Sequence, residues 1–299
     1  MTSTPDARSE HTSALSPPLR WFITGASGGL GRALVQEALE AGDTVVATVR
    51  RPDALRELTE AHPDRLHVEL LDVTDSAAVA TTVGRVLAEH GHIDVVVNNA
   101  GYTIVGAAEE LTDAELDHQL ATLLHAPLQI TRAFLGPMRE HGVGRIIQVS
   151  SLGGQVSFPA SSAYHAGKWG LEGFTEAVAQ EVAEFGVRLT IVEPGGMGTD
   201  FGVNMRTAAA IGAYERGSVG EFRRWLTTAG SDVFRADPAK VARVIFDTTR
   251  APEPPLRLAL GADAYEMLQQ ALRGRLDALE AQRELAQSVA FTSSVPVSG

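Results

Sequence analysis

The 299-residue chain contains no cysteine, which excludes disulfide bonds, thiolate metal sites and a cysteine nucleophile. Lysine is almost absent, since only Lys168 and Lys240 occur, so a lysine at a special position is more informative than usual. No apolar run reaches about 18 residues, so we expect no membrane span. Residues 1–18 lack the basic start and apolar centre of a secretory signal, and we interpret them as a flexible polar tail.

Positive charge is also scarce. The 37 acidic residues outnumber the 25 lysines and arginines, which gives a formal net charge of −12. Such a surface repels nucleic acids and anionic membranes, so we expect neither as a partner. The composition is typical of an acidic cytoplasmic enzyme that acts on a small molecule, and we expect no metal site.

Short apolar runs alternate with longer helical patterns from Leu19 onward. This alternation is typical of parallel strands joined by crossover helices. The expected strands are residues 19–24, 44–50, 65–73, 93–99, 144–151, 186–194 and 255–260. We therefore predict an α/β fold with a doubly wound (Rossmann) parallel sheet of about seven strands and helices on both faces. Residues 19–260 are expected to form this single domain, and residues 261–299 a C-terminal helix and tail.

Residues 195–232 break the alternation. They are rich in glycine, methionine and aromatic residues, have weak helical periodicity and show no strand pattern. An insertion after the sixth strand emerges at the carboxyl edge of the sheet, where ligands bind in such folds. We interpret the segment as a lid over that edge; a surface helical hairpin with no ligand role is the alternative.

A glycine-rich turn, TGASGGLG at 24–31, follows the first expected strand and opens a helix. Gly25, Gly29 and Gly31 permit a tight turn and close approach of the backbone to a pyrophosphate, which the helix N-terminus then faces. Within a βαβ unit this turn predicts a dinucleotide site; a plain strand-to-helix connection is the alternative.

The end of the second strand distinguishes the two nicotinamide dinucleotides. An acidic residue there binds the free 2′-hydroxyl of NAD, whereas arginine accommodates the 2′-phosphate of NADP. This chain has Arg50 and Arg51 with no carboxylate before Asp53, which favours NADP(H), although a solvated basic turn would have the same sequence. Asp72, after the third strand, is expected either to bind the adenine amine or to cap a helix.

Tyr164 and Lys168 are four residues apart, so on a helix they share one face. A tyrosine with its usual pKa of about 10 is a poor acid–base catalyst at neutral pH. A nearby ammonium favours the phenolate and lowers that pKa, so the pair is a candidate catalytic unit.

Six motifs follow one another in the order typical of one enzyme family: TGASGGLG, LLDVTD, NNAG, the serines 150–151, YHAGK and EPGGMGTDF. Over about residues 19–260 the chain therefore resembles the short-chain dehydrogenase/reductase family, of the common NADP-dependent type. The stretch from Asp237 to Ala264 is also similar to family members related to 17β-hydroxysteroid dehydrogenase.

The resemblance implies hydride transfer between nicotinamide and a carbonyl or carbinol carbon, with Tyr164 giving or taking the hydroxyl proton. Ser151, rather than its neighbour Ser150, would hydrogen-bond the reacting oxygen. Lys168 would hold the nicotinamide ribose and depress the pKa of Tyr164, and Thr199 would contact the carboxamide or phosphate side of the cofactor. The implied cofactor contacts are Gly25, Ser27, Gly29, Leu30, Gly31, Arg50, Arg51, Asp72, Val73, Asn99, Ala100, Gly101, Tyr164, Lys168, Pro194, Gly195 and Thr199, with Asn98 beside them.

One position departs from the family. Counting back from the TRAF motif places Leu123 where the family has a catalytic asparagine, whose main-chain carbonyl holds a water in the proton relay to the lysine. Pro127 has no N–H for the carbonyl of Leu123, so we hypothesise that it supplies the helix kink and the free carbonyl. His125 is a competing relay group, or else an exposed or interface histidine; the third alternative is a lost relay with impaired catalysis.

Aromatic and methionine residues around the lid predict an apolar pocket for a medium-sized ketone or secondary alcohol. The candidates are Phe158, Met197, Phe201, Tyr214 and Trp225, with Val156, Met205 and Phe222 nearby, although some of these will instead pack the lid itself. We predict an NADP(H)-dependent reductase or dehydrogenase. The alternatives are a redox-neutral epimerase or rearrangement enzyme on the same fold, and a catalytically impaired nucleotide-binding protein. By resemblance, residues 112–141 and 160–185 form the interface of a homodimer or homotetramer.

Overall fold

The predicted strands form one parallel sheet in the computed structural model, which describes residue 15 and residues 17–199, 205–228 and 236–290. Seven strands lie in the order β3-β2-β1-β4-β6-β7-β9. Their bounds are β1 (Arg20–Ile23), β2 (Thr44–Val49), β3 (Leu66–Leu70), β4 (Val95–Asn98), β6 (Gly144–Val149), β7 (Val187–Pro194) and β9 (Arg257–Leu260). Every neighbouring pair is parallel, which confirms the doubly wound α/β fold expected from the sequence.

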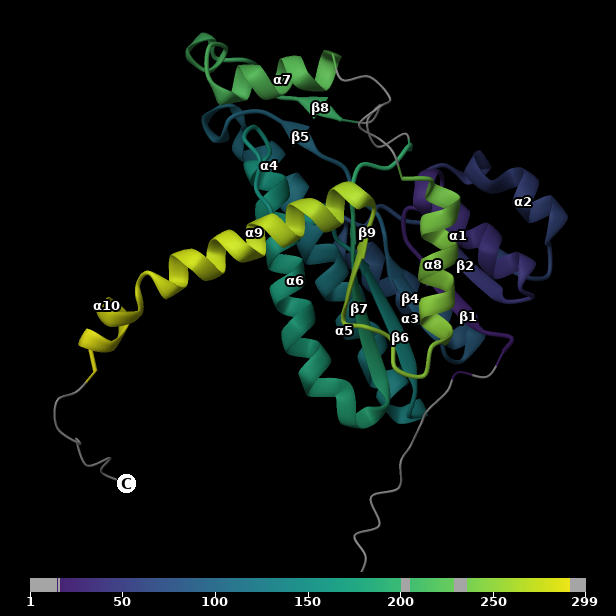
Figure 1. Ribbon diagram of the computed structural model, residues 1–299. Coiled ribbons are helices and arrows are strands. Elements are labelled where there is room, and N and C mark those ends of the chain that lie inside the picture. Colours follow the sequence, from purple (N-terminus) through teal and green to yellow (C-terminus); the bar gives the residue numbers. More distant parts are fainter. Residues whose placement is uncertain (1–14, 16, 200–204, 229–235, 291–299) are drawn as a thin grey trace, which may run out of the picture.

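Helices cover both faces of this sheet because the strand side chains alternate between two apolar clusters (Figure 1). In β1, Trp21 and Ile23 belong to one cluster and Phe22 to the other. The first cluster includes α1 (Gly29–Glu40) and α8 (Pro238–Arg250). The second includes α3 (Ser76–His90), α5 (Ala126–His141) and α6 (Ser162–Val182), while the short α2 (Arg56–Ala61) lies between β2 and β3 in the chain.

The strand order reverses beside β1. The chain runs outward from β1 to β2 and β3, then returns to β4 on the other side of β1. The loops after β1 and β4 therefore lie side by side at the carboxyl edge, where the backbone N–H of Asn99 donates to Thr24 Oγ1 at 2.9 Å. Ligands bind at such switch points in open parallel sheets.

The helix expected over residues 112–141 is interrupted. A π-helical turn at Ala121–His125 separates α4 (Asp113–Leu120) from α5. The N–H of Ala126 donates to the carbonyl of Ala121, five residues back, and Pro127 has no N–H with which to restore the four-residue pattern. The helix therefore bulges where the sequence predicted a distortion.

The segment 195–232 contains a strand, contrary to the expectation from its sequence. β8 (Arg206–Thr207) pairs in parallel with β5 (Ile104–Val105), and a strand of two residues is too short to leave an alternating pattern. Helix α7 (Ser218–Thr228) follows and lies with β8 and β5 beyond the carboxyl edge of the main sheet (Figure 1). A buried ion pair, Arg223 Nη2 to Glu110 Oε2 at 2.7 Å, fastens α7 to the loop before α4.

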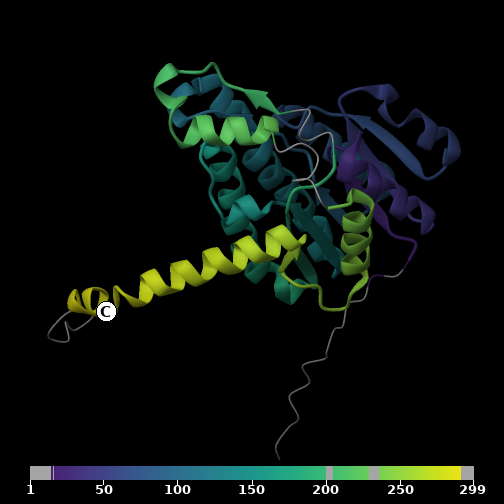
Figure 2. The ribbon, with the colours of Figure 1, turned by 45° about the horizontal axis from the view of Figure 1, so that its top comes forward.

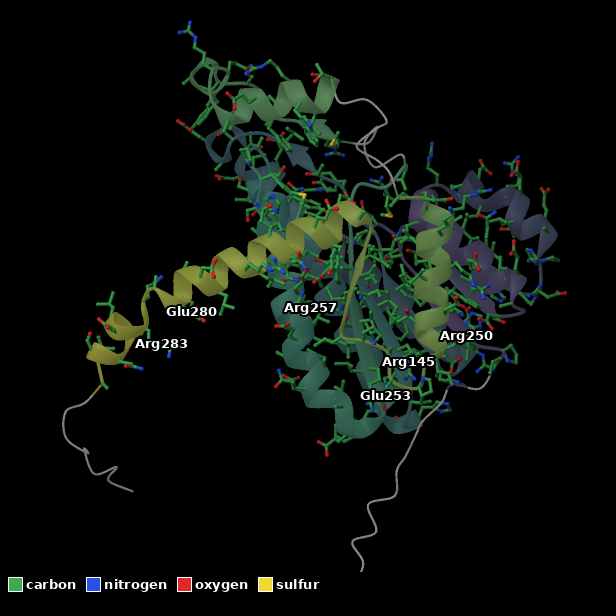
Figure 3. The ribbon with its side chains drawn as sticks, in the orientation of Figure 1. Arg145, Arg250, Glu253, Arg257, Glu280 and Arg283 are labelled. Carbon is green, nitrogen blue, oxygen red and sulfur yellow. The ribbon has the colours of Figure 1, made fainter. Side chains whose placement is uncertain are left out.

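The C-terminal helices α9 (Ala262–Glu280) and α10 (Arg283–Ser288) project away from the domain in two views (Figures 1 and 2). Only Ala264 and Leu268 in these two helices are buried. Figure 3 shows Glu280 and Arg283 far from the sheet, whereas Arg257 is part of its edge strand β9. No helix in the described part of the chain combines the length and apolar character needed to cross a membrane.

Candidate active site

A cavity of about 780 Å³ lies at the carboxyl edge of the main sheet. Its walls come from the loops that follow β1, β2, β3, β4, β6 and β7, from α6, and from β8 and α7. It thus brings the glycine-rich turn, the tyrosine–lysine pair and the apolar side of the lid into one space. A cavity of this size accommodates an organic ligand and its cofactor contacts.

The glycine-rich turn forms a backbone cradle in this cavity. Gly25 has a φ of +65°, and a Cβ there would lie 2.8 Å from the Cα of Ala100, so the position requires glycine. Asn99 ties the two loops together, because its Nδ2 donates to the carbonyls of Thr24 at 2.9 Å and Gly25 at 3.1 Å. Ser27, Gly29 and Leu30 also line the cavity.

Gly31 and Asn98 lie outside the cavity lining. A Cβ on Gly31 would approach the carbonyl of Gly25 to 2.4 Å, so this residue lets α1 pack against the turn. Asn98 is buried under the edge, where its Nδ2 donates to Thr131 Oγ1 at 3.2 Å. Gly31 and Asn98 therefore contribute to the site through packing and hydrogen bonding beneath the cavity wall.

Two arginines follow β2 in the same cavity. Arg50 and Arg51 both line it, and in the part of the chain that the structure describes neither makes an ion pair with a carboxylate. Asp53, the next acid in the sequence, pairs with Arg56 instead. Both arginines thus present positive charge to the cavity, and Arg50 also helps to lower the pKa of the Asp72 carboxyl.

Asp72 is a turn residue and not a helix cap. Its Oδ1 accepts from Thr74 N–H at 2.9 Å and from Thr74 Oγ1 at 2.7 Å, and these hydrogen bonds lower the pKa of the carboxyl. Asp75 caps α3. Asp72 and Val73 both line the cavity, beside the loop that carries Ala100 and Gly101.

Ser151, Tyr164 and Lys168 meet in the cavity wall. Burial raises the pKa of Tyr164 to about 12, although a hydrogen bond with the Ser151 side chain works in the opposite direction. The lowering of the Tyr164 pKa by Lys168 stays a prediction. Lys168 Nζ lies 5.8 Å from the centre of the Tyr164 ring and donates to the carbonyl of Val149 at 2.7 Å. Burial lowers the pKa of this ammonium to about 8, and Glu172 opposes the shift.

Ser150 lines the cavity, but its hydroxyl donates a hydrogen bond to another protein side chain. Its Oγ donates to Glu172 Oε1 at 2.5 Å, one helical turn beyond Lys168. Ser151 is therefore the serine whose side chain contacts Tyr164, and its expected hydrogen bond to the reacting oxygen stays a prediction.

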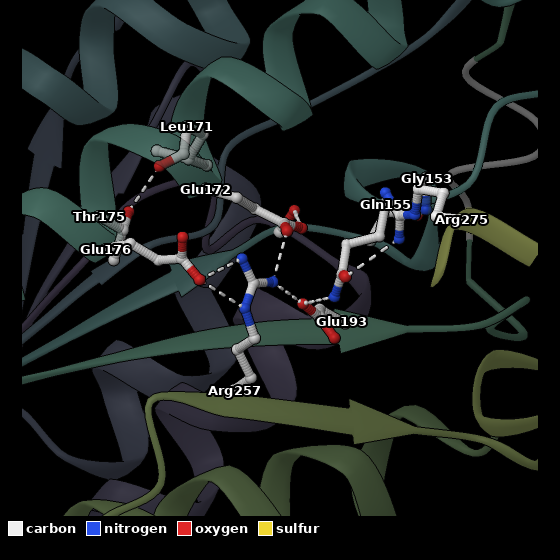
Figure 4. Close-up of polar contacts among 11 residues, drawn as sticks. Gly153, Gln155, Leu171, Glu172, Thr175, Glu176, Glu193, Arg257 and Arg275 are labelled. Carbon is white, nitrogen blue, oxygen red and sulfur yellow. Dashed lines mark hydrogen bonds and ion pairs between the residues drawn. The ribbon is translucent and has the colours of Figure 1, made fainter. Parts of the chain in front are cut away.

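Behind the loop that carries Ser150 and Ser151, three carboxylates surround the guanidinium of Arg257 (Figure 4). Its Nη1 lies 2.6 Å from Glu172 Oε2, its Nη2 lies 2.8 Å from Glu176 Oε1, and it also pairs with Glu193. Burial raises the pKa of Glu172, while the hydrogen bonds from Arg257 and Ser150 lower it. This Glu172 cluster was not predicted from the sequence.

Leu123 occupies the space beside Lys168. A Cβ on Gly167 would lie 2.8 Å from Leu123 Cβ, and one on Gly101 would lie 3.2 Å from Leu123 Cδ2 and 3.9 Å from Lys168 Nζ. His125 is exposed and does not line the cavity, because the π-helical turn directs it outward, so it is badly placed for a relay. Pro127 is buried outside the main cavity.

The lid contributes apolar side chains to the cavity, together with the charged Arg206 of β8. The apolar lining residues at this end are Val105, Leu152, Phe158, Met197, Met205, Phe222 and Leu226, and Thr199, Pro194 and Gly195 lie in the loop that leads toward them. Tyr214 and Trp225 do not line the cavity: Tyr214 donates its hydroxyl to Glu109 at 2.7 Å, and Trp225 lies on the outer side of α7. Val156 is also outside the lining, and Phe201 lies outside the described residues.

Three further polar side chains in the cavity, those of Tyr102, His118 and Arg206, were not predicted from the sequence. The Tyr102 hydroxyl lies 2.7 Å from His118 Nδ1, and the Arg206 guanidinium lies 5.1 Å from the centre of the Tyr102 ring. All three line the cavity, but they come from separate segments, and no motif connects them.

Among the described residues, one group of three side chains of the metal-binding type occurs, at the amino end of β4: His92, Asp94 and His141. Arg20 Nη1 lies 3.2 Å from His92 Nδ1, and the two imidazoles stack with centres 4.0 Å apart. Nearly parallel rings do not direct their lone pairs to one point, and the guanidinium repels a cation.

Comparison with known proteins agrees with this geometry. A family model described as short chain dehydrogenase matches residues 20–210. An oxidoreductase of Botryotinia fuckeliana is 39% identical over 248 residues, covering 82% of this chain and 90% of that protein. A crystal structure of a short-chain dehydrogenase from Streptomyces avermitilis is 39% identical, with a TM-score of 0.84, covering 92% of this chain and 100% of that chain. A metagenomic short-chain oxidoreductase in complex with NADP is 27% identical, with a TM-score of 0.64, covering 81% and 97%.

Proposed function

Because the chain belongs to the short-chain dehydrogenase family of oxidoreductases, we propose that it is an NADP(H)-dependent reductase of ketones or dehydrogenase of secondary alcohols. The observation that carries this proposal is the placement of Ser151, Tyr164 and Lys168 in the same cavity as the glycine-rich turn. Hydride transfer to a carbonyl needs both parts, a dinucleotide site and an acid beside the carbonyl oxygen.

The residues present fit such a dinucleotide. The cradle at Gly25 leaves no room for a side chain, and the N-cap residue of α1 is Gly28, which has no side chain to cap the helix, so the backbone N–H groups of this turn can approach a pyrophosphate. Arg50 and Arg51 would hold a 2′-phosphate, and Asp72 the adenine side. The NADP in the 27% identical neighbour supports this choice.

Tyr164 supplies the proton. When bound, NADP(H) provides the hydride donor or acceptor. With a pKa near 12, Tyr164 keeps its hydroxyl hydrogen at neutral pH, and that hydrogen moves to the carbonyl oxygen as negative charge develops there. The Ser151 hydroxyl donates a second hydrogen bond to the same oxygen.

Lys168 stabilises the tyrosinate that remains. Its ammonium, held on the carbonyl of Val149, lies close enough to Tyr164 to offset the phenolate charge in a buried site. By the family resemblance it also holds the nicotinamide ribose. Both roles require the protonated form.

Proton resupply to Lys168 runs along the helix bulge in this proposal. The π-helical turn and Pro127 leave the carbonyl of Leu123 without its α-helical donor, and the Leu123 side chain lies beside Lys168. A water on this carbonyl would connect Lys168 to solvent without the asparagine that the family carries.

The substrate is a medium-sized carbonyl compound with an apolar body. Phe158, Phe222 and Leu226 offer hydrophobic area, and their aromatic rings suit a planar or cyclic ligand. Phe158 and Phe222 stack with ring centres 6.4 Å apart, so they form one continuous wall.

The test is reduction of a ketone panel by purified protein with NADPH. We expect one equivalent of NADPH to be consumed per alcohol formed, and a loss in kcat of at least about 100-fold in Y164F with NADPH binding retained. Y265F is the matched control, because Tyr265 is exposed on α9. Tight NADPH binding without turnover would contradict the proposal, and product formed without net NADPH consumption would identify the redox-neutral alternative.

A further inference from the structure

His165, the residue after Tyr164, is buried and uses both ring nitrogens. Its Nε2 lies 2.8 Å from the backbone nitrogen of Phe158, and its Nδ1 lies 2.7 Å from the carbonyl oxygen of Gly153. A backbone N–H only donates, so Nε2 must be the unprotonated acceptor. Nδ1 then carries the hydrogen and donates it to Gly153, which fixes one neutral tautomer.

These two hydrogen bonds close the loop between β6 and α6. Gly153 and Phe158 are five residues apart in that loop, and the imidazole spans the gap between them. A Cβ on Gly153 would lie 3.2 Å from the imidazole and 3.2 Å from Tyr164 Cε1, so the ring is seated closely against the catalytic loop.

The closed loop positions one wall of the substrate end. The Phe158 ring packs on His165 with centres 5.5 Å apart and stacks on Phe222 of α7, and Phe158 also packs against the apolar cluster of Leu152, Ala264 and Leu268. Two residues further on, Ala160 has a φ of +61°, and its carbonyl accepts from Gly106 N–H at 2.9 Å. The segment is thus held at His165, at the lid and at β5.

We propose that His165 is a positioning residue for substrate specificity: as a neutral clamp it holds Phe158 against the lid and so selects bulky, apolar carbonyl substrates. His165 also lines the cavity, but in this role it acts through Phe158. The inference rests on the proposed reductase function and adds the residue that shapes its pocket.

Three variants separate the two hydrogen bonds. In H165Q the side-chain Oε1 takes the place of Nε2 and keeps the bond from Phe158, whereas in H165N the Nδ2 takes the place of Nδ1 and keeps only the bond to Gly153. H165F keeps neither. Because an unpaired buried N–H is costly, we expect the KM for 1-tetralone to rise about 10-fold in H165N and H165F and less than about 3-fold in H165Q.

The kinetic control is acetone, a ketone too small to need the wall. Its KM, the kcat for both ketones and the Kd for NADPH should change less than about 3-fold in all three variants, whereas a general structural defect would move them together. H141N, at an exposed histidine beyond the amino edge of the sheet, should match the wild type. Equal KM changes for the two ketones, or no rescue in H165Q relative to H165N, would overturn the proposal.

A second measurement does not depend on turnover. Long-range proton–nitrogen NMR of the wild type, with the His165 signals assigned by their loss in H165N, should show the Nδ1–H tautomer at pH 7. The Nε2–H tautomer or a charged imidazolium would refute the clamp. If the wild type reduces no ketone, both the proposed function and the specificity role of His165 fail. If the wild type is active and the KM values of the His165 variants are unchanged, only the specificity role of His165 fails.

Discussion

Replacing Arg257 with leucine is expected to destabilise the protein by about 3 kcal/mol. The substitution leaves Glu172 and Glu193 without their cation, and both carboxylate side chains are only 3% exposed. Removing one partner of a buried ion pair typically costs about 3–5 kcal/mol. The lower end applies because the Arg257 side chain is 30% exposed and because Ser150 and Gln155 still donate to the two acids.

The first assay is equilibrium unfolding. At about 2 °C per kcal/mol for a chain of this size, the melting temperature of R257L should fall by about 6 °C at pH 8. The matched control is R243L, since the Arg243 side chain is 59% exposed and its ion pair with Asp247 lies on the surface. We expect that control to lose less than about 1 kcal/mol.

The pH dependence makes the test more specific. Burial already raises the pKa of Glu172, and Arg257 is one of the groups that lower it, so R257L should raise it further. A carboxyl group whose pKa is higher in the folded than in the unfolded state destabilises the fold when ionised, and this cost disappears as the pH falls through the folded pKa. The deficit of R257L should therefore shrink from pH 8 to pH 5. A deficit under about 1 kcal/mol, or one that is the same at both pH values, would refute the reasoning.

Three further outcomes test the proposed function. P127A, which restores an N–H to the helix, should lower kcat at least about tenfold without lowering the melting temperature, and unchanged turnover would contradict the backbone relay. The double substitution of Arg50 and Arg51 by alanine should raise the KM for NADPH about 10- to 100-fold and leave that for NADH unchanged, and a parallel change in both would remove the 2′-phosphate argument. Because the pKa of Lys168 is about 8 and its charged form is the one required, kcat/KM for NADPH should fall as the pH rises through about 8, a limb that K168R should shift to higher pH.

Much of the fold could be predicted because buried parallel strands leave a local signal. Runs such as VVATV in β2 are apolar on both faces, and the helices between them carry a regular period, so strand number and sheet type followed from the sequence. The π-helical turn was only partly predictable. Pro127 predicts that one backbone hydrogen bond of the helix is missing. Whether the helix then kinks or forms a π-helical turn with one extra residue depends on the packing around Leu123.

Some residues of the candidate site could likewise be predicted from local motifs, and others could not. The glycine-rich turn and the Tyr164–Lys168 pair are contiguous motifs, so their chemistry could be inferred directly. In the Glu172 cluster, Arg257 lies 64 to 85 positions along the chain from the acids that it contacts, and no local pattern connects them. Trp225 was misplaced because the sequence of an amphipathic helix does not show which side packs on the domain, and α7 directs Phe222 and Leu226 toward the cavity. Tyr214 was misplaced because it lies in the turn before α7, where its hydroxyl donates to Glu109.

The position of Arg257 also has a consequence for how the protein is made. It belongs to β9, the last strand of the sheet, while Glu172 and Glu193 belong to α6 and β7. During synthesis from the N-terminus the two acids emerge before their cation exists. In a chain that stops before β9, one edge of β7 is therefore unpaired, and Glu172 and Glu193 have no cation. Docking of β9 pairs this edge and supplies the Arg257 guanidinium. The last strand of the sheet to be translated thus completes the ion pairs of Glu172 and Glu193.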